Sequence, residues 1–269
     1  MARWRELGRH IQALDDIGSI MSAMRSLAFI EVRRLAEGVA RQQETVGAMR
    51  VAIDNLVAHY PEARPAVVPQ RDVLVMIGSE RGLCGDFDER IALSLNANAP
   101  SARLAVGSRL CLRLDEQGLA YDAIPGAAVI EDIPGVMLQI ASAMRRFNQQ
   151  DHDIRTGLVA IHHADDGAVR HTRILPVPVA PPKQCWRSKP ILQLDPPQLH
   201  DMLLEHYVLA SLNAILLASL LAENRRRLDQ MSAALDRLHE QVDKLDRKRR
   251  RARQEAITEE VEIILLGQA

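Results

Sequence analysis

The chain has 269 residues, 47% of them hydrophobic, so it can bury a sizeable core in one or two domains. Its formal net charge is −1, which argues against a strong overall field that would draw it to nucleic acid or to a membrane surface. The three cysteines, Cys84, Cys111 and Cys185, lack CxxC spacing, so they argue against a disulfide framework and a zinc site and fit a reducing compartment.

Residues 1–60 are predicted to form one long helix. No proline occurs before Pro61, and apolar residues recur at alternating steps of three and four, which is the a/d seam of a coiled coil. The seam positions are Leu14, Ile17, Met21, Met24, Ala28, Val32, Leu35, Val39, Gln42, Val46, Met49, Ile53 and Leu56. Two consecutive steps of four, from Met24 through Ala28 to Val32, form a stutter that locally unwinds a supercoil.

Residues 70–195 are predicted to form a Rossmann-like α/β head domain with loops, because short apolar strands alternate there with helices. Strands are expected at Val73–Ile77, Arg103–Val106 and Leu119–Ile124, and helices at Phe87–Asn96 and Asp132–Asn148. Asp132 is expected to be the N-cap of the second helix. Gly157–His162 and Val169–Val177 flank Asp165-Asp166-Gly167, a pattern typical of a β-hairpin.

Residues 198–269 are predicted to form a second long helix, since neither proline nor glycine occurs from Gln198 to Leu266. Such a helix would be about 100 Å long and needs a partner along its length. Its seam positions are Leu203, Tyr207, Ala210, Ala214, Leu217, Leu221, Leu228, Met231, Leu235, Leu238, Val242, Leu245, Arg249, Ala252, Ala256, Glu259, Ile263 and Leu266. The two matching seams predict a long antiparallel coiled coil; the alternative is a pair of core helices in a globular bundle, although those average three to four turns.

One stretch of this second helix is apolar enough to be considered as a membrane span. It carries no charge from Tyr207 to Ala222, which is shorter than the roughly 20 residues that a span requires. We therefore expect a helix buried against protein.

A glycine-containing loop, Gly78-Ser-Glu-Arg-Gly-Leu-Cys-Gly85, follows a predicted strand and precedes a predicted helix, where a phosphate-binding loop would lie. It matches neither GxGxxG nor GxxxxGK[ST] and contains no lysine, so only Arg81 could meet a phosphate. A structural turn is the favoured interpretation, with Gly82 and Gly85 serving the backbone. A nucleotide-dependent enzyme with a coiled-coil arm stays open as the alternative.

A dense basic run, Lys244–Arg253, lies on the second long helix. Nucleic-acid binding is one interpretation, but no aromatic residue interrupts the run and acidic residues such as Glu255 follow at once. A solvated helix face, or a charged face toward an acidic protein partner, fits better. The histidines, including the adjacent His162 and His163, suggest no catalytic or metal-binding set.

Three motifs in order resemble the gamma subunit of F-type ATP synthases, and the resemblance covers essentially the whole chain. Arg81-Gly82-Leu83-Cys84-Gly85 resembles the head-domain signature turn of that family. Ile11–Arg34 resembles its N-terminal shaft helix, with Met24 at the family's shaft methionine. Ala252-Arg-Gln-Glu-Ala-Ile-Thr-Glu-Glu260 resembles its C-terminal signature.

The resemblance implies a central rotor shaft without catalytic residues, metal or cofactor. The shaft would couple ion-driven ring rotation to ATP synthesis or hydrolysis at the beta subunits. The implied partners are the alpha and beta subunits of an alpha3-beta3 hexamer, the epsilon subunit and the membrane c-type ring, with one gamma chain per complex. The implied location is peripheral, on the cytoplasmic side of a bacterial inner membrane, and no nucleic acid is involved.

The resemblance also implies contact residues. Met24 falls on the shaft position that sets coupling, and Arg253, Gln254 and Thr258 fall on positions that contact beta-subunit loops. Several residues depart from the family pattern, as in a divergent, alternative type of ATP synthase; they are Ser22, Asp86, Ile263, Leu266 and Gln268.

Overall fold

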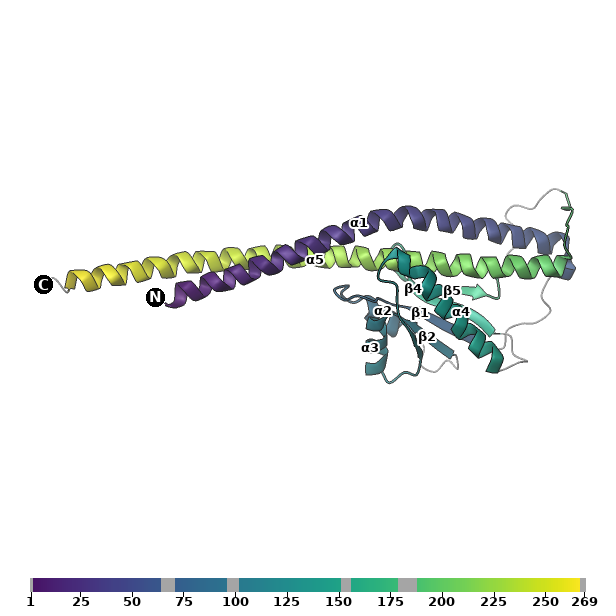
Figure 1. The fold of residues 1–269 in the computed structure, drawn as a ribbon, viewed down its shortest axis with the longest axis horizontal. Coiled ribbons are helices and arrows are strands. Elements are labelled where there is room, and N and C mark those ends of the chain that lie inside the picture. The colour runs from purple at the N-terminus through teal and green to yellow at the C-terminus, as the bar shows by residue number, and fades with distance from the viewer. Residues whose placement is uncertain (1, 64–70, 96–101, 151–155, 179–187, 267–269) are drawn as a thin grey trace. The chain divides into compact units, whose positions relative to one another are not determined.

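The computed structural model describes residues 2–63, 71–95, 102–150, 156–178 and 188–266. Two long helices, α1 (Ala2–His59) and α5 (Pro196–Leu266), stand at the two ends of the sequence (Figure 1). The chain divides into two compact units. We call Met1–Ile30 with Arg227–Ala269 the terminal unit, and Glu31–Arg226 the central unit.

Both long helices are bounded by proline, as the sequence predicts. α1 ends at His59, and after Tyr60 a short 3-10 turn begins at Pro61. α5 begins at Pro196, two residues before the predicted start at Gln198, because the fixed φ and missing N–H of proline suit the first turn of a helix. The predicted extension of this helix to residues 267–269 lies outside the described residues.

The central unit is built on a five-stranded sheet with the strand order β3-β2-β1-β4-β5. The strands are β1 (Arg71–Ile77), β2 (Ala102–Val106), β3 (Asp122–Ile124), β4 (Thr156–His163) and β5 (Val169–Leu175). The first four run parallel and β5 runs antiparallel to β4. Because parallel strands are covered on both faces, β1 and β4 read as nearly continuous apolar runs.

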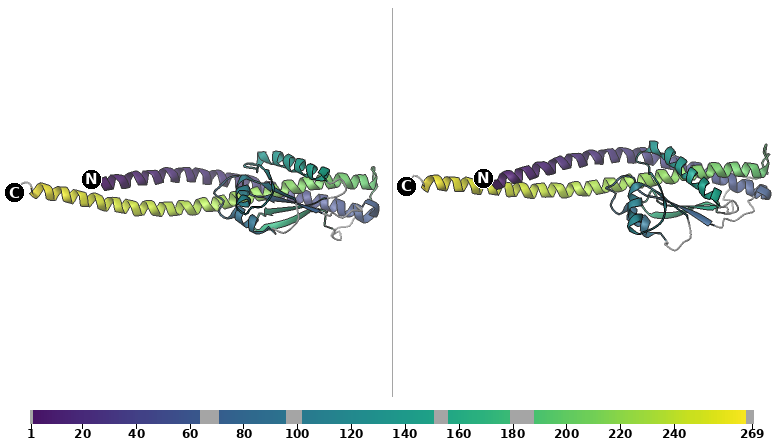
Figure 2. Two further views of the ribbon diagram at one scale, coloured as in Figure 1. Left: turned by 90° about the horizontal axis from the view of Figure 1, so that it is seen from below. Right: turned by 60° about the horizontal axis from the view of Figure 1, so that its bottom comes forward.

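The two faces of this sheet are covered by different helices. On one face, residues such as Val75 and Leu158 pack against α4 (Ile133–Gln150) and against apolar residues of α1 and α5. On the other face, Met76 and Ile161 pack with α2 (Phe87–Leu93) and α3 (Ser108–Glu116). Within the central unit, α1 and α5 run side by side (Figure 2), and the Gln42 side-chain amide donates to the Ala210 carbonyl oxygen at 3.2 Å. The fold is therefore mixed α/β.

The predicted hairpin is confirmed. β4 and β5 pair in an antiparallel register from His163–Val169 toward Leu158–Leu175. The loop closes with a hydrogen bond from Ala164 N–H to the Ala168 carbonyl oxygen at 2.9 Å. Gly167 adopts φ 77°, the left-handed conformation that a three-residue hairpin loop requires.

Four elements differ from the sequence-based predictions. β3 begins at Asp122 rather than at Leu119. α2 ends at Leu93 rather than at residue 96, and residues 96–101 lie outside the described residues. α3 was not predicted, since its nine residues are too few to display a clear helical period. Asp132 does not cap α4: its carboxylate accepts hydrogen bonds from the N–H groups of Ala128 and Val129, at 2.9 and 3.1 Å, in the 3-10 turn (Ile130–Asp132) that precedes it.

α5 is the only helix in the described ranges that is long and apolar enough to cross a membrane by length and composition. Of its most apolar window, 61% is buried inside the protein, and the core helix of a soluble protein passes the same test. Leu212, Leu216 and Leu220 belong to the core that α5 shares with the sheet. This agrees with the expectation of a helix buried against protein.

In the terminal unit, the first half of α1 packs on the last half of α5. Met231, Leu235 and Leu238 are buried there, at the predicted seam spacing. On α1 the predicted seam residue Ile17 is exposed instead, and Gly18 faces Leu238: a Cβ atom at Gly18 would lie 3.3 Å from Leu238 Cδ2. A glycine allows the two helices to approach closely, and hydrophobic spacing alone did not reveal it.

Candidate functional site

The first candidate site is the loop between β1 and α2, which contains the signature turn. Ser79 is fixed by Asp88 in the first turn of α2: the Ser79 N–H donates to Asp88 Oδ1 at 2.7 Å, and the Ser79 hydroxyl donates to Asp88 Oδ2 at 2.6 Å. Burial raises the pKa of Asp88 above its ordinary value, although both hydrogen bonds oppose that rise. The loop therefore begins as a rigid segment.

A second carboxylate ties this loop to the next two strand ends. Glu80 accepts hydrogen bonds from the Ser108 N–H at 3.0 Å, the Ser108 hydroxyl at 2.7 Å and the Gly126 N–H at 2.7 Å. Burial favours the neutral form of Glu80, but these hydrogen bonds outweigh it and lower the pKa of the carboxyl group. Ser108 begins α3, so a helix N-terminus that could attract an anion already holds a protein carboxylate.

In the signature turn Arg81–Gly85, the cysteine side chain lies against backbone carbonyl groups of the same turn. The Cys84 thiol is buried and lies 3.4 Å from the Arg81 carbonyl oxygen and 3.5 Å from that of Gly82. Leu83 adopts φ 70°, a conformation that is rare for leucine, and 57% of its surface is exposed. Gly85 has φ 64°, which glycine adopts without strain.

The hydrogen bonds of this loop therefore join β1 to α2, to α3 and to the segment after β3. The backbone amides of Ser79 and Ser108 bind carboxylates of the chain itself, and those negative charges would repel a phosphate. Arg81 is exposed at the surface. Nothing in these contacts favours the nucleotide-binding interpretation of residues 78–85, and the structural role of the turn stays a prediction.

The second candidate site is in the terminal unit, where the four predicted contact residues lie at two different positions (levels) along the helices. Met24 is half-buried on α1, whereas Arg253, Gln254 and Thr258 are exposed on α5. The Arg253 guanidinium lies 5.9 Å from the ring centroid of Trp4, within cation–π range. Along α1, Trp4 and Met24 are separated by about 30 Å at the rise of an α-helix.

The structure therefore does not bring Met24 to the three α5 residues. The Thr258 hydroxyl donates to the Gln254 carbonyl oxygen at 3.0 Å, one turn earlier on the same helix. These exposed side chains are available to a partner, but they form no catalytic arrangement. They suit a protein contact surface.

The basic run of α5 is partly neutralised by its own helix. Asp246 pairs with Arg249 at 2.6 Å and with Arg250 at 2.8 Å. Arg247, Lys248, Arg251 and Arg253 are exposed and have no acidic partner among the described residues. These four cations form the part of the run that could face an acidic protein surface.

Two features of the central unit were missed by sequence reasoning. His163 is buried, stacks on Phe87 with ring centroids 3.8 Å apart, and places Nε2 2.8 Å from the Phe87 carbonyl oxygen. Arg225 and Arg226 bind two loops at the carboxyl end of the sheet. Within the described ranges, no group of three or more His, Cys, Asp and Glu side chains could hold a metal ion.

Comparisons with known proteins identify the family. The family described as ATP synthase matches residues 3–269. The ATP synthase gamma chain of Desulfitobacterium hafniense is 27% identical, covering 99% of this chain and 98% of that protein, and the one from Sulfurovum sp. is 24% identical with the same coverage. The rotor of the Euglena gracilis mitochondrial ATP synthase superposes with a TM-score of 0.62 at 15% identity, covering 95% of this chain and 99% of that one. The chain belongs to the gamma-chain family of ATP synthases.

Proposed function

We propose that this chain is the central rotor of an F-type ATP synthase and is itself non-catalytic. It couples rotation of an ion-driven membrane ring to ATP synthesis or hydrolysis at the beta subunits. The observation that carries the proposal is the match to gamma chains from end to end, joined to an architecture of two long terminal helices around an α/β unit.

In this proposal the two terminal helices form an antiparallel coiled-coil shaft. Residues 1–60 and 198–269 are the shaft helices, and residues 70–195 are the Rossmann-like head with its loops. Buried seam positions in the terminal unit, such as Met231 and Leu235, and the contact of Gly18 with Leu238 support the shaft. The strand order β3-β2-β1-β4-β5, with helices on both faces, supports the head.

A cross-linking experiment tests the antiparallel register. Gly18→Cys with Leu238→Cys is expected to form a disulfide within one chain in high yield, because the two positions face each other. Mass spectrometry of the unreduced digest identifies the linked peptides. The control is Gly18→Cys with Leu245→Cys, where the second position lies about 10 Å further along the helix and should not react. Equal yields from both pairs would reject the register.

The proposed contacts lie at two positions along the shaft. Met24 is the residue that sets coupling at one position, and Arg253, Gln254 and Thr258 contact beta-subunit loops at the other. The exposed cations Arg247, Lys248 and Arg251 face acidic loops of the beta subunits. The head, with the turn Arg81–Gly85, sits with the epsilon subunit and the c-type ring on the cytoplasmic side of a bacterial inner membrane, with one gamma chain per complex.

Reconstitution tests the function directly. Membrane vesicles carrying the ring and stator of the cognate complex, together with its alpha, beta and epsilon subunits, are expected to pump ions on addition of ATP only when this chain is included. The isolated chain is expected to hydrolyse no ATP and to bind no nucleic acid at physiological salt. Hydrolysis by the isolated chain would instead favour the enzyme interpretation, and salt-resistant DNA or RNA binding the nucleic-acid one.

A further inference from the structure

We propose that Arg225 and Arg226 are positioning residues that fasten α5 to two loops of the head and so transmit torque between head and shaft. This proposal rests on the rotor function proposed above. Both arginines belong to the central unit, and α5 continues beyond them as an unbroken helix to Leu266. They stand directly after a stretch of α5, Ser219–Asn224, in which every residue is buried.

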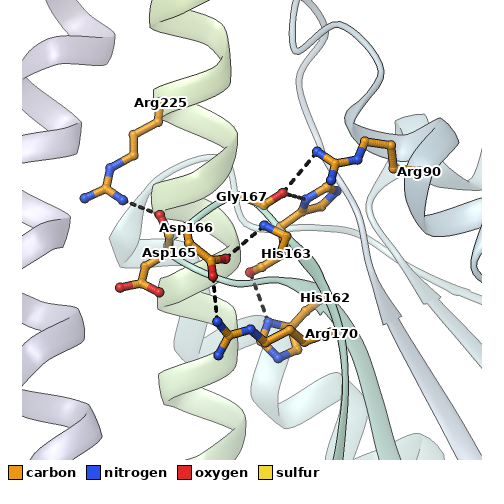
Figure 3. Close-up of polar contacts among 9 residues, drawn as sticks. Arg90, His162, His163, Asp165, Asp166, Gly167, Arg170 and Arg225 are labelled. Atoms are coloured by element: carbon orange, nitrogen blue, oxygen red, sulfur yellow. Dashed lines mark hydrogen bonds and ion pairs between the residues drawn. The ribbon is translucent and has the colours of Figure 1, made fainter.

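The first loop is the tip of the β4–β5 hairpin, where polar side chains from three elements converge (Figure 3). The Arg225 guanidinium of α5 donates to the Asp165 carbonyl oxygen. Arg90 of α2 donates to the Gly167 carbonyl oxygen at 3.1 Å, and His163 Nδ1 lies 3.1 Å from the same oxygen. The tip is thereby tied to α2, to the sheet and to α5 at once.

This hairpin tip is itself rigid. Asp166 accepts a hydrogen bond from the Ala168 N–H at 2.9 Å and pairs with Arg170 at 2.6 Å. The pKa of Asp166 is held below its ordinary value, mainly by the hydrogen bond from Ala168 N–H and secondly by the hydrogen bond from Arg170. The carboxylate therefore keeps its charge at neutral pH. These two contacts brace the loop residues next to Asp165.

The second loop is the one that carries the signature turn. Arg226 donates to Asp86 Oδ1 from Nη2 at 2.5 Å and from Nε at 3.2 Å. Glu223, one turn earlier on α5, places a carboxylate oxygen 3.9 Å from the Cys84 thiol. Consecutive residues on an α-helix point about 100° apart, so Arg225 and Arg226 reach loops on two different sides of α5.

Hydrophobic burial holds α5 against the sheet, and its close-packed side chains already resist rotation of the helix about its axis. Hydrogen bonds from two diverging arginines are directional and add to that resistance at two loops. Exposed ion pairs add little to folding stability, so stability alone does not account for this arrangement.

The test is the number of ions pumped per ATP hydrolysed by the reconstituted complex. Arg225→Ala with Arg226→Ala removes the hydrogen bonds to Asp165 and Asp86 and is expected to lower this ratio about fivefold, the factor that corresponds to a net loss of about 1 kcal/mol. The matched control is Arg173→Ala, which removes an ion pair to Asp72 (2.7 Å) of similar exposure that does not involve α5. The control is expected to keep the wild-type ratio.

A charge exchange separates positioning from folding. Arg226→Asp alone sets two carboxylates against each other and is expected to lower the ratio, whereas Arg226→Asp combined with Asp86→Arg restores the pair and should recover it. A wild-type ratio in the double alanine variant, an equal loss in the Arg173→Ala control, or no recovery in the exchanged variant would overturn the proposal. A wild-type complex that neither assembles nor pumps would refute the rotor function instead, so the two failures are distinguishable.

Discussion

Replacing Gly78 with alanine is expected to destabilise the chain by about 3–5 kcal/mol, a large fraction of the stability of an ordinary domain. A Cβ atom at this position would lie 2.4 Å from Leu110 Cβ and 2.6 Å from Asp88 Oδ1. Overpacking of this kind typically costs about 1–3 kcal/mol, and displacing the Asp88 carboxylate from Ser79 adds the loss of charged hydrogen bonds. Urea unfolding of the purified chain measures the difference.

Gly47→Ala is the matched control for this substitution. Gly47 lies within α1, and a Cβ atom there would meet nothing within 4 Å. Alanine is the better helix former by about 0.5–1 kcal/mol, so this variant should be slightly more stable than the natural chain. A Gly78→Ala variant as stable as the Gly47→Ala variant would show that the signature loop does not depend on the close approach of α3.

Replacing Met24 with lysine is expected to slow ATP-driven ion pumping about tenfold, which corresponds to about 1.4 kcal/mol added to the rotary barrier. Met24 is half-buried in the terminal unit. A lysine there either remains a poorly solvated charge or forms a new pair with an acidic residue of a beta subunit, which would over-stabilise one rotary state. The measurement is pumping and hydrolysis by the reconstituted complex over a range of temperatures.

Arg253→Ala is the comparison for the lysine variant. Its loss removes the cation–π contact with Trp4 and would also remove the charge-assisted hydrogen bonds that we propose to beta-subunit loops, which would be worth roughly 1.5–3 kcal/mol. Arg253 is exposed and lies about 30 Å from Met24 along the helices. We therefore expect Arg253→Ala to weaken binding to the beta subunits and to change the rotary barrier less than Met24→Lys does. If Met24→Lys left the rates of pumping and hydrolysis and their temperature dependence unchanged, Met24 would have no role in coupling.

The sequence predicts the long helices and the hairpin well because their signals are local. The absence of proline and glycine from Gln198 to Leu266 bounds α5, and Asp166-Gly167 marks the hairpin turn. The seam was harder to place, because a period of apolar residues assigns Ile17 to it, whereas the packing selects Gly18 for its small size.

The polar contacts of the head could not be predicted because each joins residues that are distant in the sequence. Glu80 binds Ser108 and Gly126, and Arg226 binds Asp86, only after the strands have brought the loops together. A charged residue in a loop or on a helix normally indicates a solvated surface, so the sequence contains no sign of these partners. The candidate contact residues Met24, Arg253, Gln254 and Thr258 follow from the family resemblance alone.

The most direct test of the rotor function is observation of rotation. The alpha3-beta3 complex containing this chain is immobilised through the beta subunits, and a visible probe is attached to the head through Ser142→Cys, an exposed position on α4. The account predicts that ATP drives stepwise rotation of the probe in one direction and that rotation stops when ATP is withdrawn. Sustained ATP hydrolysis by assembled complexes while the probe stays still would contradict it.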